Sequence, residues 1–501
     1  MLCKQVNNAI TFLPAKPWLQ YLGLALITLL AAALRFYKLG EWSLWIDEIF
    51  TINHAVNHFS TPQLMVEHLP PHRNWVPLSV ILAAQVFNAW GINEFNSRLV
   101  AAVVGVLTIP VLYFFVKKIF NNRVALIVCL LLAVSPWHID WSQNARGYTT
   151  LMLFYSLALF AFYFVLEKDR GSYLVLFFLF LYLAASERLI ALFILPVLVV
   201  YLFAVPFFSF EKPAGLRARN MLILLSPVLL FLALQVFMSI RSGDSMLGSI
   251  LNEIMDTFFG KPIEGAMTQA TFMVFKLGIP LVVLSSFSAI YLWIQKSRQG
   301  LFFSLAAIVP FVLVVIITPF MFTEERYAFV TLPSWLILAA VGIDLLLVRL
   351  KKYELIFAVG ILAVLLGDAM GANLLYFRTN HGNRWDWKSA FGLVQANLQE
   401  GDVVVTTFSE VGNYYLGRDD VVAWEEVNAE SIQAEGNRVW FVVIPDMTWY
   451  TGTEDFYYWV VHSTRMIRTL YLRTVDNTNL EIYLYDPAIS SEMAPLKDPL
   501  K

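Results

Sequence analysis

Residues 18–50 read WLQYLGLALITLLAAALRFYKLGEWSLWIDEIF, a long apolar run that leads into an aromatic segment ending with the acidic pair Asp47-Glu48. An apolar run of this length can cross the hydrocarbon core of a bilayer as a helix. Two neighbouring carboxylates beside Trp42 and Trp45 at a membrane surface add little stability, but they are suited to accepting a proton and orienting a substrate. The stretch therefore predicts a membrane protein with a reactive site where its first span ends.

The composition extends this prediction to most of the chain. Of the 501 residues, 58% are hydrophobic and 14% are charged, whereas soluble proteins carry about 25% charged residues. Uncharged runs recur up to about residue 375, which predicts a polytopic α-helical membrane protein. The formal net charge of −2 and the lack of a basic patch give no indication of a nucleic-acid partner. Cys3 and Cys129 are not placed to cross-link an extramembrane domain, so no disulfide is expected.

About eleven spans are predicted, at roughly 18–34, 97–116, 124–137, 148–166, 173–186, 189–206, 221–240, 272–294, 301–320, 327–347 and 353–375. A further run, 75–91, has to be assigned separately. If it does not span, every basic cluster between spans falls on one side, which the positive-inside rule makes the cytoplasmic side. We therefore interpret 75–91 as an interfacial or re-entrant helix on the outer face, with the N-terminus inside.

This topology places the first loop, about 35–96, and the chain after about residue 376 on the outer face. The segments KSAFGLVQANLQ and EDFYYWVVHS predict helices, whereas GDVVVTTF, RVWFVVIP, MIRTLYLRTV and LEIYLYD predict strands. Alternating helices and strands are typical of an α/β domain. We expect a transmembrane domain over 1–375 and a small extracytoplasmic α/β domain over 376–501.

The acidic pair has two interpretations. If Asp47 and Glu48 lie on a helix, adjacent side chains point about 100° apart and do different jobs. A partly dry aromatic setting disfavours the charged carboxylate and makes it a better base. The alternative is a solvated loop in which the pair caps a helix. Spacing alone leaves both interpretations open.

A second polar cluster, SPWHIDWSQNARGYTTLML at 135–153, lies between two apolar runs and includes His138, Arg146 and Tyr148. Charged groups inside a bilayer are costly, so such a cluster lies in surface water or lines a cavity. Arg146 at the head of the next helix can bind a phosphate through two parallel hydrogen bonds. The alternative is an interfacial anchor belt.

A third cluster, FTEERYAFVTLP at 322–333, opens another span with Arg326 and Tyr327. A cation at this depth can hold the phosphate of a lipid. The alternative is an arginine that only extends its charged end to the membrane surface.

Two further segments on the outer face are less specific. EHLPPHRNWVPL at 67–78 contains His72 and Arg73, but the spacing of its histidines matches no metal signature. Glu187-Arg188, between two apolar runs, is interpreted as a solvated turn. The carboxylate pair and the arginines on one face suit a lipid phosphate donor and a polar acceptor.

Taken in order, ALRFYKLGEWSLWIDEIF, the PL of WVPL, NSRLVAAVVGVLTIPVLYFFVKKIF, SPWHIDWSQNARGYTTLML and ERYAFVTLP resemble the membrane glycosyltransferases of the GT-C fold. More narrowly, they resemble bacterial relatives of protein O-mannosyltransferases and of the aminoarabinose transferase that modifies lipid A. The resemblance covers about residues 18–375. It implies an inverting transfer of a sugar from a polyprenyl-phosphate donor on the outer face of the bacterial cytoplasmic membrane. The acceptor, whether lipid, glycan or protein, stays open.

The resemblance also implies roles for particular residues. Asp47 matches the acidic motif of the first outer loop and is expected to be the general base, with Glu48 orienting the acceptor or the base. Arg146 and Arg326 are expected to bind the donor phosphate. Further candidates for substrate contact are His72, Arg73, His138, Tyr148 and Tyr327.

Two departures from the family pattern limit what is carried over. The usual Gln-Glu-Ala-Arg run is Gln143-Asn144-Ala145-Arg146 here, so no acid–base or metal role is transferred to residue 144. The usual His-Pro-Pro run is the looser Pro70-Pro71-His72-Arg73. No metal site is predicted, because the sequence shows no dedicated ligand set, although a divalent cation assisting the phosphate remains compatible with it.

Two other classes of function compete with the enzyme. A lipid-linked sugar transporter or flippase should place buried charges near mid-span, and Asp344 and Asp368 are the few such residues here. A non-catalytic envelope assembly protein would tolerate Asp47→Asn. The sparse charge within the spans favours the enzyme over the transporter.

Overall fold

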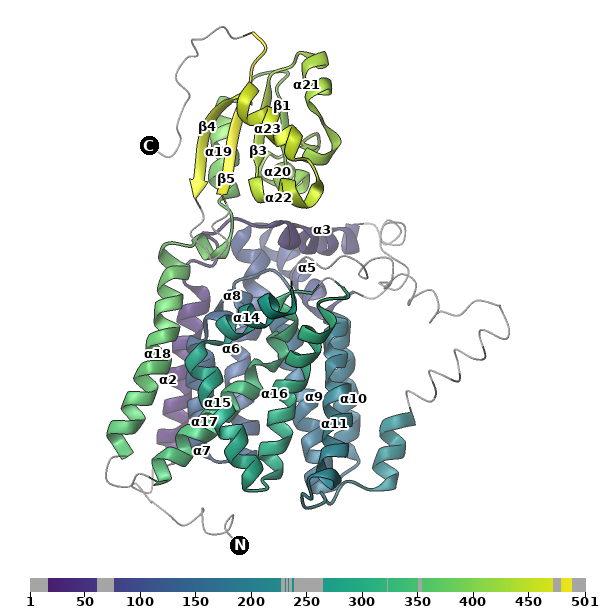
Figure 1. Ribbon diagram of the computed structural model, residues 1–501, viewed down its shortest axis with the longest axis vertical. Coiled ribbons are helices and arrows are strands. Elements are labelled where there is room, and N and C mark those ends of the chain that lie inside the picture. The colour runs from purple at the N-terminus through teal and green to yellow at the C-terminus, as the bar shows by residue number, and fades with distance from the viewer. Residues whose placement is uncertain are drawn as a thin grey trace.

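The computed structural model describes residues 17–60, 76–226, 230, 233, 237, 265–321, 323–349, 354–471 and 479–488. A helical bundle forms one part of the molecule, and a smaller region of mixed helices and strands lies on one end of it (Figure 1). The bundle corresponds to the apolar part of the sequence and the smaller region to the more polar part. The site considered below lies where the two parts meet.

The bundle contains α2 (Pro17–Phe36), α6 (Glu94–Ile119), α7 (Asn122–Val134), α8 (Pro136–Ser142), α9 (Tyr148–Lys168), α10 (Ser172–Glu187), η3 (Leu189–Phe193), α11 (Ile194–Phe207), α14 (Ala266–Leu277), α15 (Ile279–Ile294), α16 (Arg298–Ile317), η4 (Glu325–Thr331), α17 (Leu332–Arg349) and α18 (Glu354–Arg378). Among the described residues, seven helices are long and apolar enough to cross a membrane. The number rises to nine if α7 with α8, and α14 with α15, each form one bent span. The other two predicted runs are α10, which has only 16 residues, and 221–240, most of which lies outside the described residues.

Two predicted spans are bent rather than straight. Within 124–137, α7 and α8 meet at 60°, and within 272–294, α14 and α15 meet at 94°. Pro136 begins α8 and keeps the residue before it, Ser135, out of the helical conformation. Gly278 adopts a φ of 91°, which side chains disfavour, and ends α14. After the first bend and α8, the chain reaches the start of α3, where Ala145 and Arg146 contact the acidic pair.

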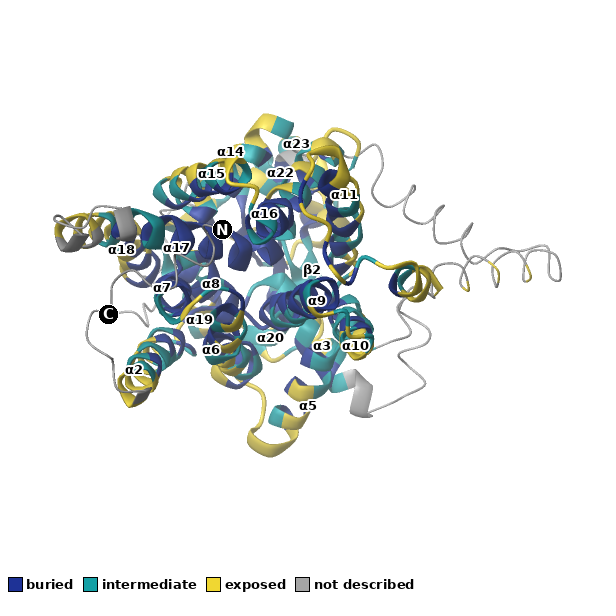
Figure 2. Ribbon diagram, turned by 90° about the horizontal axis from the view of Figure 1, so that it is seen from below, coloured by how far each residue is buried: buried dark blue, intermediate teal, exposed yellow. Residues whose placement is uncertain are grey.

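The outward faces of the bundle are apolar. Seen along the bundle, buried residues face its centre, and exposed residues gather on the outer faces of helices such as α2 and α18 (Figure 2). Leu26 and Leu29 on α2, and Val359 and Leu374 on α18, are each more than half exposed. In a membrane protein such side chains contact lipid rather than water.

Two helices lie across the end of the bundle, beneath the strand-containing region (Figure 1). They are α3 (Ile46–Ser60) and α5 (Leu78–Trp90). With 13 residues, α5 is too short to cross a hydrocarbon core about 30 Å thick. Asp47 lies in the first turn of α3. The position of α3 therefore sets the position of the acidic pair.

The strand-containing region consists of α19 (Trp387–Asn397), β1 (Val403–Thr406), α20 (Ser409–Leu416), β2 (Val422–Ala423), η6 (Trp424–Glu426), α21 (Ala429–Glu435), β3 (Val439–Val443), α22 (Pro445–Thr451), α23 (Glu454–Ser463), β4 (Arg465–Tyr471) and β5 (Asn479–Tyr485), preceded by η5 (His381–Asn383). Its sheet has the order β2-β1-β3-β5-β4. β1 runs parallel to β2 and β3, and β5 runs antiparallel to β3 and β4. The four predicted strands and two predicted helices are present, whereas β2, α20, α21 and α22 had no clear sequence signal.

This region shares a hydrophobic core with α3 and α5. The shared core includes Leu44, Ile49, Ile52, Val80, Ala83, Trp387, Phe391, Val411 and Trp440. The backbone N–H of Leu44 also donates to the Tyr415 hydroxyl at 2.7 Å. Burial of apolar surface is favourable, at about 25 cal/mol per Å². The shared core therefore stabilises the packing of α3 against the C-terminal region.

Candidate functional site

Asp47 forms ion pairs with two arginines from distant parts of the chain. Its Oδ2 accepts a hydrogen bond from Arg326 Nη1 at 3.0 Å and lies 3.5 Å from Arg146 Nη2. The side chain of Asp47 is 19% exposed, and those of Arg146 and Arg326 are 13% and 14% exposed. The structure thus brings together three residues that the sequence predicted for the site, in a setting where each has partial access to solvent.

Arg146 belongs to the short segment between α8 and α9. Its Nη1 donates to the backbone oxygen of Asp47 at 2.9 Å and to the Thr51 hydroxyl at 3.2 Å. Burial, followed by the neighbouring Arg188 cation, lowers the pKa of Arg146 to about 10, against the opposing effect of Asp47. Arg146 is therefore still charged near neutral pH and is held to the first turn of α3.

Arg326 links Asp47 to a second carboxylate. Its Nη2 pairs with Glu324, which sequence analysis had not selected. Burial raises the pKa of Glu324 to about 7, although Arg326 acts in the opposite direction. The Arg326 guanidinium also lies 5.7 Å from the centre of the Trp45 ring, within the range of a cation–π interaction. One guanidinium therefore bridges two carboxylates at the entrance to η4.

Tyr148 lies beside two of the cations. It begins α9, is 2% exposed, and its ring centre lies 4.2 Å from that of Trp141. The guanidinium carbons of Arg326 and Arg188 lie 5.9 Å and 5.3 Å from its ring centre. Tyr327, half-buried at the start of η4, follows Arg326 directly. Both predicted tyrosines therefore lie next to the arginine cluster.

The expected solvated turn at Glu187-Arg188 is wrong. Glu187 is only 6% exposed, and its carboxylate accepts hydrogen bonds from the Ser79 backbone N–H at 2.9 Å and from the Ser79 hydroxyl at 2.6 Å. It thereby caps the start of α5. The guanidinium of Arg188 lies over the ring of Tyr148. The sequence shows only that Glu187 and Arg188 are adjacent and oppositely charged. It could not show that Glu187 binds Ser79 while Arg188 contacts Tyr148.

Glu48 is fully buried and differs sharply from its neighbour Asp47. Arg98 binds it through Nε to Oε1 and Nη2 to Oε2, both at 2.8 Å, and the Ala145 N–H donates to Oε1 at 2.7 Å. Arg384 Nε lies 3.4 Å from Oε2. Burial favours a higher pKa, but Arg98 and then Arg384 outweigh it, and the pKa of Glu48 falls below its usual value.

This geometry bears on the expectation that Glu48 orients the acceptor or the base, which stays a prediction. Both oxygens of Glu48 are occupied by protein groups, and the side chain has no exposed surface. Because it binds the N–H of Ala145, the residue before Arg146, it holds the segment after α8 against α3. Its contacts join the two segments that carry Asp47 and Arg146.

Arg98 organises the turn before α3. Its Nη1 donates to the backbone oxygens of Leu39 and Trp42 at 3.1 Å and 2.9 Å, and its Nη2 donates to Ser43 at 2.7 Å. Sequence analysis treated Arg98 as part of an apolar segment. A buried arginine within such a segment is costly unless it is fully paired. The presence of an arginine among apolar residues could therefore have indicated that Arg98 has a buried carboxylate partner.

The remaining predicted residues lie elsewhere. His138 is fully buried inside the bundle, with Nδ1 2.6 Å from Arg35 Nη2, and it does not contact the Asp47 cluster. His138 therefore lies apart from this cluster, and its contact with a substrate stays a prediction. His72 and Arg73 lie outside the described residues. Within the described parts of the chain, no group of three or more His, Cys, Asp or Glu residues is placed to hold a metal ion.

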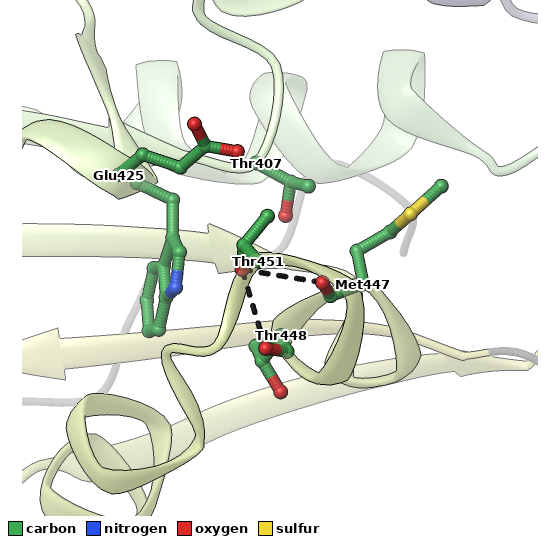
Figure 3. A pocket seen from close by; sticks show the side chains of 6 residues that line it. Thr407, Glu425, Met447, Thr448 and Thr451 are labelled. Carbon is green, nitrogen blue, oxygen red and sulfur yellow. Dashed lines mark hydrogen bonds between the residues drawn. The ribbon is translucent and has the colours of Figure 1, made fainter. Parts of the chain in front are cut away.

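A concavity lies in the C-terminal region, where Thr407 follows β1 and Met447 follows β3 (Figure 3). It encloses about 190 Å³ of empty space, part of it open solvent, and is lined by Thr407, Trp424, Glu425, Met447, Thr448 and Thr451. Thr451 donates to the backbone oxygens of Met447 and Thr448. None of its lining residues belongs to the Asp47 cluster, and its hydroxyl groups are already used within the domain.

Comparisons with known proteins agree with a glycosyltransferase fold. Residues 70–231 match the family model described as dolichyl-phosphate-mannose-protein mannosyltransferase. No curated protein matches the sequence. The crystal structure of ArnT from Cupriavidus metallidurans in the apo state is similar over 91% of this chain and 97% of that chain, with 15% identity and a TM-score of 0.57.

Two further structures give the same result. ArnT from Cupriavidus metallidurans bound to undecaprenyl phosphate is similar over 93% of this chain and 98% of that chain, with 13% identity and a TM-score of 0.56. The apo oligosaccharyltransferase of Archaeoglobus fulgidus is similar over 87% of this chain and 71% of that chain, with 14% identity and a TM-score of 0.57. The resemblance inferred from sequence is thus confirmed at the level of the fold: this multi-pass membrane protein has the fold of the GT-C glycosyltransferases.

Proposed function

We propose that the protein is a membrane glycosyltransferase that moves a sugar from a polyprenyl-phosphate donor to an acceptor, with inversion at the sugar carbon. The observation that carries this proposal is the contact of Asp47 Oδ2 with both Arg146 and Arg326. A base for the acceptor and cations for a leaving phosphate are thereby assembled in one place. The similarity to a structure bound to undecaprenyl phosphate supports a lipid-linked donor.

The proposed reaction has one displacement step. The acceptor O–H attacks the anomeric carbon, the bond from that carbon to the phosphate oxygen breaks, and Asp47 takes the acceptor proton. The electron pair of the broken bond stays on the phosphate, where Arg146 and Arg326 stabilise the added negative charge. The phosphate is a good leaving group, so the reaction needs no general acid. Inversion also avoids a covalent intermediate with the enzyme.

The resting contact between base and cations has to open during this reaction. In an in-line displacement the acceptor oxygen and the leaving phosphate lie on opposite sides of the sugar carbon. Asp47 and Arg326, 3.0 Å apart here, then have to separate to admit the sugar. The transfer of Arg326 to the phosphate also frees Asp47 Oδ2 to accept the proton of the acceptor.

Other residues have supporting roles in the proposal. Glu48, with Arg98 and Arg384, positions Asp47 and Arg146 relative to each other. Tyr148 and Tyr327 are candidates for contact with the sugar. His72 and Arg73, which precede α5 in the sequence and lie outside the described residues, stay candidates. A divalent cation is compatible with this scheme, which routes no step through one.

The proposed setting is the cytoplasmic membrane of a bacterium, with the N-terminus inside and the C-terminal region outside. The lipid matrix and the donor are the expected partners, together with an acceptor that is a lipid, a glycan or a protein. An acceptor on the outer face reaches Asp47 beneath the C-terminal region, which packs on α3.

The test is a comparison of glycolipids and glycoproteins, by mass spectrometry, from cells that make the wild type or Asp47→Asn. Loss of one sugar modification with normal membrane levels of the variant is expected, because the amide cannot take the acceptor proton. Asp420→Asn, which changes an exposed carboxylate of the C-terminal region, is the matched control and should keep the modification. Unchanged products with Asp47→Asn would remove the catalytic proposal and favour a transporter or an assembly protein.

A further inference from the structure

Arg188 is a cation of the site whose guanidinium is not committed to any carboxylate. It lies at the C-cap of α10, and its guanidinium carbon lies 5.3 Å from the Tyr148 ring centre. Within the described parts of the chain, this guanidinium forms no ion pair and no hydrogen bond. Arg146 and Arg326, in contrast, are both engaged by Asp47, and Arg326 also by Glu324.

The position of Arg188 is fixed by its neighbour. Glu187 accepts both hydrogen bonds from Ser79, at 2.9 Å and 2.6 Å. A side chain at Gly147 would collide with Glu187, so this glycine allows the start of α9 to approach the turn closely. These contacts hold the end of α10 beside the segment that carries Arg146. Because the Glu187 carboxylate is used in this way, it does not pair with the adjacent guanidinium.

Three guanidiniums lie in this part of the structure, those of Arg146, Arg188 and Arg326. Asp47 and Glu324 pair with Arg146 and Arg326, and Glu187 is engaged by Ser79, so no carboxylate pairs with Arg188 among the described residues. Arg188 is close enough to Arg146 to lower its pKa, an effect second only to that of burial. An incoming anion can therefore bind Arg188 without first breaking an ion pair.

We propose that Arg188 is the first residue to bind the phosphate of the donor, and that Arg326 moves from Asp47 to this phosphate afterwards. The inference rests on the proposed function and assigns an order of contacts within it. The donor is a phosphodiester with one negative charge, and the released phosphate monoester carries up to two. The demand for cations thus grows as the sugar–phosphate bond breaks, when the second and third arginines are needed.

This order also explains how Asp47 is protected before the donor arrives. While both arginines hold Asp47, its Oδ2 is engaged by their guanidiniums and is not available to water or an early acceptor. Once the phosphate, docked on Arg188, draws Arg326 away, Asp47 Oδ2 loses this contact and can reach the acceptor O–H. The base is therefore activated only after the donor has bound.

The first experiment measures binding of undecaprenyl phosphate, with undecaprenol as the matched ligand without phosphate, to protein reconstituted in lipid nanodiscs. Arg188→Gln is expected to weaken undecaprenyl phosphate binding by about tenfold to a hundredfold, since a charge-assisted hydrogen bond contributes about 1.5–3 kcal/mol. Undecaprenol binding should not change. Arg188→Lys should restore part of the affinity, because it keeps the charge and loses the planar two-point contact.

The control variant is Arg217→Gln, which removes an arginine that is 64% exposed and paired with Asp169. It should bind undecaprenyl phosphate as the wild type does. If Arg188→Gln also binds like the wild type, the inference is overturned. If the wild type itself binds undecaprenyl phosphate no better than undecaprenol, the lipid-phosphate donor of the proposed function fails instead.

A second measurement keeps the inference testable if Arg188→Gln does not fold. An arginine-directed dicarbonyl reagent is applied to the wild type, and modification of Arg188 is followed by mass spectrometry. Undecaprenyl phosphate should protect Arg188 at concentrations where undecaprenol does not. Equal modification of Arg188 with both lipids, while Arg326 becomes protected, would show that the donor bypasses Arg188.

Discussion

Arg384 Nε lies 3.4 Å from Glu48 Oε2, so the segment that leads into the C-terminal region is ion-paired with the residue next to Asp47. Arg384 also donates from Nη2 to the backbone oxygen of Gln143 at 2.8 Å. The start of α3, the segment after α8 and the C-terminal region therefore meet at one buried carboxylate. This relationship makes the C-terminal region part of the machinery that positions the proposed base.

Arg384→Ala should lower kcat for sugar transfer by about tenfold while leaving the donor KM within about twofold, since a small misplacement of reacting groups costs rate more than binding. Arg384→Lys should recover part of kcat, because a cation again faces Glu48. Transfer kinetics with purified protein in nanodiscs give both constants. A variant that changes only the donor KM would place Arg384 at the substrate instead.

Arg98→Ala should destabilise the protein more than Arg384→Ala does. Arg98 makes two 2.8 Å contacts with Glu48 and three backbone contacts, and removing one partner of a buried pair costs about 3–5 kcal/mol. Thermal unfolding in detergent, monitored by intrinsic fluorescence, measures the difference. Similar unfolding temperatures for Arg98→Ala and the wild type would contradict the structural role of this ion pair.

Sequence reasoning selected the three residues of the candidate site because charged residues stand out against apolar runs. Arg146 and Arg326 lie at the beginnings of spans, and Asp47 lies in the aromatic segment after the first span. A charge near the membrane is costly unless it has a partner or a function. Placing them on one face of the membrane was enough to predict that they cooperate. Their direct contact required the fold, since 99 residues separate Asp47 from Arg146.

The different roles of Asp47 and Glu48 could not be read from sequence. The two carboxylates are chemically alike and adjacent, and only the partners that the fold supplies separate them. Arg98 and Arg384 bury Glu48, whereas Asp47 keeps 19% of its side-chain surface. The bends at Ser135 and Gly278 were missed for a similar reason, because apolar composition alone reads two short helices as one span.

The pKa of Glu324, raised to about 7 from an ordinary value of 4.5, predicts a pH dependence of donor binding. Below pH 7 Glu324 takes up a proton and releases Arg326 from one of its two carboxylates. The apparent donor KM should therefore fall by about threefold to tenfold between pH 8 and pH 6, in line with the loss of one partly buried ion pair. The donor phosphodiester does not titrate in this range.

Glu324→Gln is the matched variant for this prediction. It should show a low donor KM that no longer changes between pH 6 and pH 8. The same shift in pKa makes the folded state less stable as the pH rises from about 4.5 to about 7, since the folded protein keeps its proton longer than the unfolded chain does. A donor KM that keeps its pH dependence in Glu324→Gln would assign the titration to another group.

Tyr415→Phe separates docking of the C-terminal region from positioning of the site. The Tyr415 hydroxyl accepts the backbone N–H of Leu44 at 2.7 Å but makes no contact with Glu48. Its loss leaves a part-buried N–H without this partner, which costs about 1–3 kcal/mol. We expect a lower unfolding temperature and an unchanged kcat, in contrast to Arg384→Ala. If both variants lower kcat equally, the docking of the whole C-terminal region on α3, and not the contact of Arg384 with Glu48, positions Asp47.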